Sequence, residues 1–128
     1  MYADLDFWLA LVTEDDWFAE RAERLLEEHE DDLEVSLATF LELFLVEERF
    51  AFDRERAVTA MLELAAYPGD PDVVYQASEY ISEGLTTFDA FHAVLSDGAI
   101  VSSDGAYDAL DGIERIRLEP GGEGEGEE

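Results

Sequence analysis

The chain has 128 residues, of which 34 are Asp or Glu and seven are Lys or Arg, so its formal net charge is −27. Hydrophobic residues make up 48% of the chain, a share that supports a folded core and excludes global disorder. The absence of cysteine excludes a disulfide framework, a zinc finger and a thiol nucleophile. All seven cations are arginine, so mechanisms that need a lysine amine, such as a Schiff base or a P-loop, are excluded as well.

The acidity disfavours binding of nucleic acid through a basic patch, because phosphates would be repelled at ordinary ionic strength. This objection weakens in brine, since at about 1 M salt the Debye length falls to about 3 Å. The composition is therefore typical of a cytoplasmic protein from a halophile, with an acidic partner-binding surface as the alternative explanation. The opening residues carry carboxylates inside an apolar stretch and lack a basic leader, so we expect neither a signal peptide nor a membrane span.

Apolar periodicity and capping residues predict one domain over 1–118, in which strands and helices alternate. In chain order, the predicted elements are a strand over 1–5, a short apolar segment, a helix that Asp15 or Asp16 caps and that ends near 29, a strand over 33–36, a helix over 37–45, a helix from the Asp53 cap to about 65, a helix over 71–83 that stops at Gly84, a helix that Thr86 or Thr87 caps and that runs to 96, a strand over 99–102, a short helix over 106–110 and a strand over 114–118. This order predicts an α/β fold with a mainly parallel sheet covered on both faces. The Gly- and Glu-rich tail over 119–128 is expected to be disordered.

Four carboxylates interrupt or end apolar segments, namely Asp4, Glu42, Asp89 and Asp104. Asp4 and Asp104 follow predicted strands, and ligands of open α/β sheets gather beyond the carboxyl ends of strands. The helices that carry Glu42 and Asp89 can direct these side chains into the same crevice. Carboxylates that converge repel one another unless a divalent cation binds among them, and all-oxygen ligands favour Mg²⁺ or Mn²⁺ over Zn²⁺. In so acidic a chain each of the four can also be a helix cap or a solvated side chain, and this alternative stays open.

Several blocks of the sequence resemble a known family: MYADLDFWLAL, SLATFLELFLV, GLTTFDAFHAVLS and IVSSDGAYDAL, followed by GIERIRLEP. Over about 1–118 the chain is similar to PIN domain ribonucleases of the single-domain VapC type. The resemblance implies a PIN-like three-layer α/β/α sandwich, a catalytic and metal-binding set of Asp4, Glu42, Asp89 and Asp104, and Mg²⁺- or Mn²⁺-dependent hydrolysis of RNA. It also implies that the chain is the toxin of a type II toxin–antitoxin pair, with a cognate antitoxin as partner and a homodimer as its assembly.

The chain departs from the family pattern at Leu5 and Asp6, where PIN domains more often carry a hydroxyl residue followed by Asn or Ser. Asp6 and Asp108 are therefore secondary candidates for metal ligands. Ser102 matches a position where the family usually has a hydroxyl residue, and it can orient Asp104 or a water on the metal.

Other functions stay open. The Asp-Leu-Asp sequence over 4–6 also suggests a haloacid-dehalogenase-type phosphatase, although that family's lysine is absent. An alternative of a different class is an acidic binding module whose carboxylates hold metal structurally or not at all. Arg49, Arg54 and Arg56 form the densest cationic cluster, which can hold RNA phosphates or an acidic partner, or form salt bridges to nearby carboxylates. Phe50 and Phe52 are candidates for a partner interface.

Overall fold

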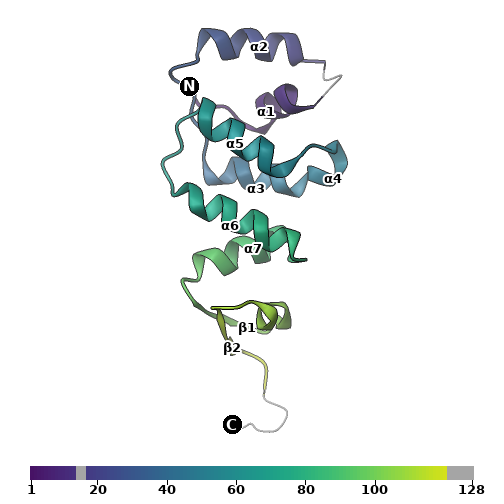
Figure 1. Cartoon of the computed structure of the whole chain (residues 1–128), viewed down its shortest axis with the longest axis vertical. Helices are drawn as coiled ribbons and strands as arrows, with labels where there is room; N and C mark the ends of the chain where they lie inside the picture. Colours follow the sequence, from purple (N-terminus) through teal and green to yellow (C-terminus); the bar gives the residue numbers. More distant parts are fainter. Residues whose placement is uncertain (14–16, 121–128) are drawn as a thin grey trace.

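The computed structural model describes residues 1–13 and 17–120, which form a mixture of helices and a small sheet (Figure 1). These residues contain seven α-helices, one 3-10 helix and one two-stranded parallel sheet. In chain order the elements are α1 (Leu5–Val12), α2 (Ala19–Glu28), α3 (Leu37–Leu45), α4 (Glu47–Phe50), α5 (Arg54–Leu64), α6 (Pro71–Ser82), α7 (Thr87–Leu95), β1 (Ala99–Ser102), the 3-10 helix η1 (Gly105–Ala109) and β2 (Glu114–Arg117).

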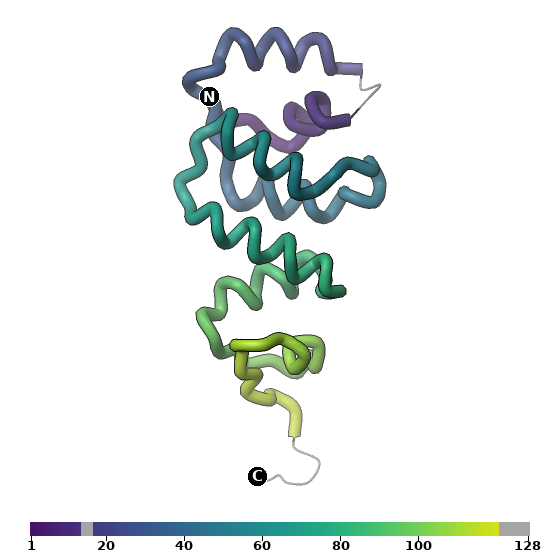
Figure 2. The backbone as a smooth tube through the Cα atoms, viewed as in Figure 1, coloured from purple at the N-terminus to yellow at the C-terminus, as the bar shows by residue number. Residues whose placement is uncertain are grey.

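The elements are stacked along the long axis of the molecule (Figure 1 and Figure 2). Helices α1 and α2 lie at one end, α3 and α5 follow, and β1, η1 and β2 lie at the other end beyond α6 and α7. None of the helices in the described ranges is long and apolar enough to cross a membrane.

Four of the predicted helices are confirmed, and local sequence signals explain their bounds. Asp53 caps α5 by accepting a hydrogen bond from the Arg56 backbone N–H at 3.0 Å. Thr86 caps α7 in the same way, because its hydroxyl accepts the Asp89 backbone N–H at 3.4 Å. Helix α6 begins with a proline and is followed by Gly84, whose φ of +113° favours glycine. The fourth helix, α3, has the bounds that its apolar spacing predicts.

The sheet is parallel, as predicted, but it is small. Strands β1 and β2 pair in a register that runs from Ala99 with Glu114 to Ser102 with Arg117. The strands predicted over 1–5 and 33–36 form single parallel bridges instead, which join Tyr2 to Glu34 and Glu34 to Ala66. The first strand is short because Asp4 caps α1, so Leu5 is already helical. Each pairing between described residues is therefore parallel, while the regular sheet is confined to β1 and β2.

Two helices differ from the sequence-based expectation. The apolar segment after the first strand is helical as α1, and α4 is an unexpected single turn that ends at Ala51 in the left-handed conformation, with φ of 55°. Helix α2 ends at Glu28 with His29 as its C-cap, close to the predicted end near 29, and its N-cap is Phe18. The predicted caps Asp15 and Asp16, and residues 121–128 of the predicted tail, lie outside the described residues.

The main core joins α1, α3, α5, α6 and α7, and a partly buried side chain of α2 packs against it. Its largest fully buried side chains include Trp8, Phe40, Leu43 and Met61. Burial of a side chain of this size contributes about 1.5 to 3 kcal/mol. Phe44 of α3 also stacks on Phe91 of α7, with ring centroids 5.6 Å apart. Helix α7 is therefore held firmly against the N-terminal helices.

A second, smaller core fastens the sheet to the helices. Ala93, Tyr107 and Leu110 are buried in it, and they pack against partly buried side chains of α6, β1 and the loops, namely Tyr80, Leu85, Ile100 and Ile113. This cluster packs the turn after β1 against α7. Two predicted site residues lie on these elements, Asp104 directly after β1 and Asp89 in the first turn of α7.

Candidate functional site

Asp89 and Tyr107 form the centre of the candidate site. Asp89 is half-buried in the first turn of α7, and the Tyr107 hydroxyl donates a hydrogen bond to its Oδ1 at 3.2 Å. Tyr107 is 3% exposed. Burial, followed by the charge of Asp89, the hydrogen bond to Asp89 and the charge of Asp104, raises the pKa of Tyr107 to about 12. The phenol is therefore a neutral donor beside a carboxylate at physiological pH.

Asp104 lies directly beyond the carboxyl end of β1, as predicted. Its Oδ1 accepts the Ala106 backbone N–H at 2.9 Å, which makes it the cap of η1. Its own backbone N–H donates to the Ser102 hydroxyl at 2.9 Å, so Ser102 does contact Asp104, although through the backbone. The charge of Asp104 also contributes to the raised pKa of Tyr107, after burial and the two effects of Asp89.

Asp108 has a structural partner. Both of its oxygens accept hydrogen bonds from the Arg115 guanidinium, at 2.8 and 2.9 Å. Arg115 also binds Glu119 and the Ser102 carbonyl, and its side chain is 6% exposed. The hydrogen bonds from Arg115 lower the pKa of Asp108. This secondary candidate therefore anchors β2 and the residues after it to the turn that follows β1.

Asp4 and Glu42 lie in the N-terminal part of the molecule. Asp4 follows the bridge at Tyr2, and its Oδ1 accepts the Asp6 backbone N–H at 3.0 Å as the cap of α1. The Tyr2 hydroxyl hydrogen-bonds Thr39 of α3 at 3.1 Å, and Glu42 is exposed one turn further along that helix. Asp6, Asp4 and Glu42 thus belong to neighbouring elements at the N-terminal end.

The four predicted carboxylates lie on α1, α3, α7 and η1 or at the caps of these elements. Among residues 1–13 and 17–120, no three or more His, Asp or Glu side chains are arranged to hold a metal ion. Asp89 and Asp104 carry oxygen ligands of the kind that a hard cation prefers, and Mg²⁺ often binds one or two carboxylates and completes its shell with water and substrate phosphates. In each of them Oδ1 has a hydrogen-bond donor, whereas no partner of Oδ2 is found in the described chain. Two carboxylate oxygens are therefore available.

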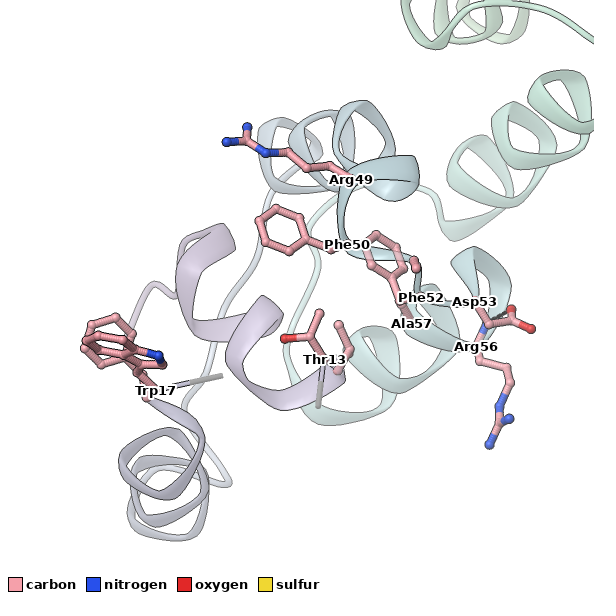
Figure 3. A pocket seen from close by; sticks show the side chains of 11 residues that line it. Thr13, Trp17, Arg49, Phe50, Phe52, Asp53, Arg56 and Ala57 are labelled. Carbon is pink, nitrogen blue, oxygen red and sulfur yellow. Dashed lines mark hydrogen bonds between the residues drawn. The ribbon is translucent and has the colours of Figure 1, made fainter. Parts of the chain in front are cut away.

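A cavity of about 1090 Å³ lies away from these carboxylates, between the end of α1, α4 and the start of α5. Figure 3 shows Trp17, Phe50 and Phe52 around it, with Arg49 and Arg56 near its edges. Trp17 is 96% exposed and Phe50 is 40% exposed. The cavity thus combines exposed aromatic rings with cations, as an interface for an acidic or aromatic partner would.

Arg54 takes no part in that cavity, although it belongs to the predicted cationic cluster. Its guanidinium donates to Glu47, to the hydroxyl and carbonyl oxygens of Ser78 and to Ser82. The salt-bridge interpretation is confirmed for this arginine, while no carboxylate within 4.0 Å of Arg49 or Arg56 is found in the described residues.

No protein family model matches the chain, and no curated protein matches it either. The family resemblance in the sequence blocks therefore stays a prediction.

Tyr107 is the site residue that was not predicted from the sequence. The signal was its spacing of three residues from the Asp104 cap, since a 3-10 helix has three residues per turn and places such residues on one face.

Proposed function

We propose that the chain is a Mg²⁺- or Mn²⁺-dependent endoribonuclease with a PIN-like three-layer α/β/α domain over 1–118, acting in the cytoplasm of a halophile. The observation that carries the proposal is the hydrogen bond from the Tyr107 hydroxyl to Asp89, because Tyr107 lies three residues after Asp104, which caps η1 just beyond the carboxyl end of the parallel strand β1. Ligand sites of α/β folds lie at such strand ends. The resemblance of the sequence blocks adds the expected substrate, RNA.

The residues of the chain have simple tasks in this proposal. Asp89 and Asp104 each offer the oxygen that accepts no described hydrogen bond, and backbone donors keep Asp104 in place. When bound, a divalent cation activates water for in-line attack on the phosphodiester and offsets charge on the leaving oxygen. No nucleophilic side chain is needed, so a chain without cysteine and lysine can perform this reaction.

Cleavage of a fluorescent single-stranded RNA in high salt with Mn²⁺ tests the proposal. We expect Asp89→Asn and Asp104→Asn to lower the cleavage rate more than about 100-fold, because each removes a charged ligand. Asp97→Asn is the matched control, since Asp97 is exposed with a left-handed φ of 56° that asparagine accepts. Equal activity of all three variants and the wild type would refute the assignment.

Asp4 and Glu42 are further members of the proposed site. If they contact the bound RNA and do not bind the metal held by Asp89 and Asp104, their variants should behave differently from Asp89→Asn. Asp4→Asn and Glu42→Gln should then lower the cleavage rate while leaving Mn²⁺ affinity within about threefold of the wild type. A loss of Mn²⁺ affinity equal to that of Asp89→Asn would instead mean that all four carboxylates share one metal site.

The toxin role, the cognate antitoxin and the homodimer are part of the same proposal. The cavity lined by Trp17, Phe50, Arg49 and Arg56 supports a protein partner, because exposed aromatic and arginine side chains are typical anchors of interfaces. Light scattering tests the homodimer: Phe50→Asp should give a monomer if the cavity is the dimer interface. An unchanged mass for that variant leaves the cavity to the antitoxin, whose binding Phe50→Asp should then abolish.

A non-catalytic binding module is the second candidate, and the same cavity favours it. Its distinguishing property is metal independence: isothermal titration of the wild type with Mn²⁺ should give no heat of binding. Strong binding that Asp89→Asn removes would exclude a module that binds no metal, and RNA cleavage would then separate the nuclease from a module that holds metal structurally.

A further inference from the structure

Tyr107 places a polar group in an apolar environment. Its ring is buried with Ala93 and Leu110, and Leu85, Ile100 and Ile113 pack against the same cluster. A buried hydroxyl without a hydrogen bond is unfavourable, so such groups find partners. Among described residues the partner of this hydroxyl is Asp89, through Oδ1 at 3.2 Å.

The hydrogen bond spans two elements that are far apart in sequence. Asp89 belongs to α7, whereas Tyr107 belongs to η1 and lies three residues after Asp104. The Asp89 backbone is held separately, because its N–H donates to the Thr86 hydroxyl. With the backbone and one carboxylate oxygen both held, rotation of the Asp89 carboxylate is restricted, and the position of its second oxygen is defined.

We propose that Tyr107 is a positioning residue for the metal site, one that holds Asp89 Oδ1 so that Oδ2 and the Asp104 carboxylate can bind one divalent cation. This inference rests on the proposed nuclease function. A donor of this kind fixes the direction of a ligand before the cation arrives. Phenylalanine would fill the same space in the core, so the hydroxyl is the feature that the role requires.

Isothermal titration with Mn²⁺ in high salt, without RNA, gives a readout that does not depend on activity. Tyr107→Phe should bind Mn²⁺ about 10- to 100-fold more weakly than the wild type, the usual cost of losing the partner of a metal ligand. Tyr75→Phe is the matched control, because the Tyr75 hydroxyl is bonded to Thr59 at 2.8 Å on another part of the surface. Its Mn²⁺ affinity should equal that of the wild type.

RNA cleavage adds a second readout. If Tyr107 acts by holding Asp89, the cleavage rate of Tyr107→Phe at saturating Mn²⁺ should be within a few-fold of the wild-type rate. The Mn²⁺ concentration that gives half of the maximal rate should be higher than for the wild type. A merely structural role would lower the rate at every Mn²⁺ concentration, and this result would overturn the proposal.

A measurement on the wild type keeps the test decisive even where Tyr107→Phe does not fold. In NMR spectra, substoichiometric Mn²⁺ should broaden the Tyr107 ring signals before those of Tyr75. Broadening of both rings alike would refute the positioning role together with the assignment of Asp89 as a metal ligand, because the Tyr107 hydroxyl is bonded to Asp89. Wild-type affinity in Tyr107→Phe together with loss in Asp89→Asn would refute the positioning role and leave the nuclease proposal standing. Unchanged Mn²⁺ binding in Asp89→Asn would instead refute the nuclease proposal itself.

Discussion

Arg54 ties α5 to α6, so its replacement by lysine should destabilise the fold although the charge is kept. The guanidinium donates to the Ser78 hydroxyl at 2.7 Å and to the Ser78 carbonyl at 2.9 Å, and it also binds Ser82 and Glu47. Its side chain is 11% exposed, so water can replace few of these hydrogen bonds. A lysine ammonium is a single point of charge and cannot match the geometry of a planar fork with several donors.

The expected magnitude follows from the hydrogen bonds that a lysine side chain cannot form. Lysine can keep about two of the four partners, and a hydrogen bond that involves a charged group contributes roughly 1.5 to 3 kcal/mol. Allowing for partial compensation by water at the exposed end, Arg54→Lys should lower the free energy of unfolding by about 2 to 4 kcal/mol. For a chain of this size that corresponds to a fall in Tm on the order of 10 °C.

Urea unfolding in high salt, followed by far-UV circular dichroism, measures this difference. Arg56→Lys is the control, because Arg56 is exposed two residues away and should change stability by less than about 0.5 kcal/mol. The difference should persist when salt is raised, since a partly buried ion pair is screened weakly. If Arg54→Lys is as stable as Arg56→Lys, the guanidinium network does not hold α5 to α6.

Three further predictions concern the second core, the pH dependence of stability and the packing of α7. Burial and Asp89 raise the pKa of Tyr107 to about 12, so the stabilising effect of the neutral phenol is complete below about pH 10 and is lost as the pH rises to about 12. Ultraviolet titration should show a tyrosine that ionises near pH 12 and that Tyr107→Phe lacks. Hydrogen bonds from Arg115 lower the pKa of Asp108, so Asp108→Asn should be less stable than the wild type at pH 7. This difference in stability should vanish as the pH falls below about 4 and the carboxylate is protonated. A difference that does not change with pH would contradict the ion pair. Phe91→Ala should cost about 3 to 5 kcal/mol in urea unfolding, because Phe91 is 3% exposed and its ring stacks on Phe44 of α3.

Features encoded in short segments were predictable from the sequence. Thr86 caps α7, β1 ends at Ser102, and Asp104 follows that strand, each as local signals indicated. The hydrogen bond between Tyr107 and Asp89 was not predictable, because it depends on how η1 packs against α7 across a sequence separation of 18 residues. Local patterns report capping and periodicity, whereas the partner of a buried hydroxyl is decided by tertiary packing.

The extent of the sheet was the least predictable feature for a similar reason. A run such as 1–5 is apolar enough for a strand, yet Asp4 also satisfies the requirements of a helix cap, and the structure uses it as one. Strand pairing between distant segments depends on tertiary packing, while a cap is formed within two residues. The result is single bridges at Tyr2, Glu34 and Ala66 in place of longer strands.

The distribution of arginine, more than the number of carboxylates, separates structural acids from candidate ligands in this chain. Arg115 neutralises Asp108, while Asp104, four residues earlier, forms no ion pair within the described residues, and neither does Asp89. With 34 acidic residues and seven arginines, pairing a carboxylate with a guanidinium is possible at few positions. Asp89 is half-buried, and its partner among the described residues is a neutral phenol, so no guanidinium occupies this carboxylate as Arg115 occupies that of Asp108.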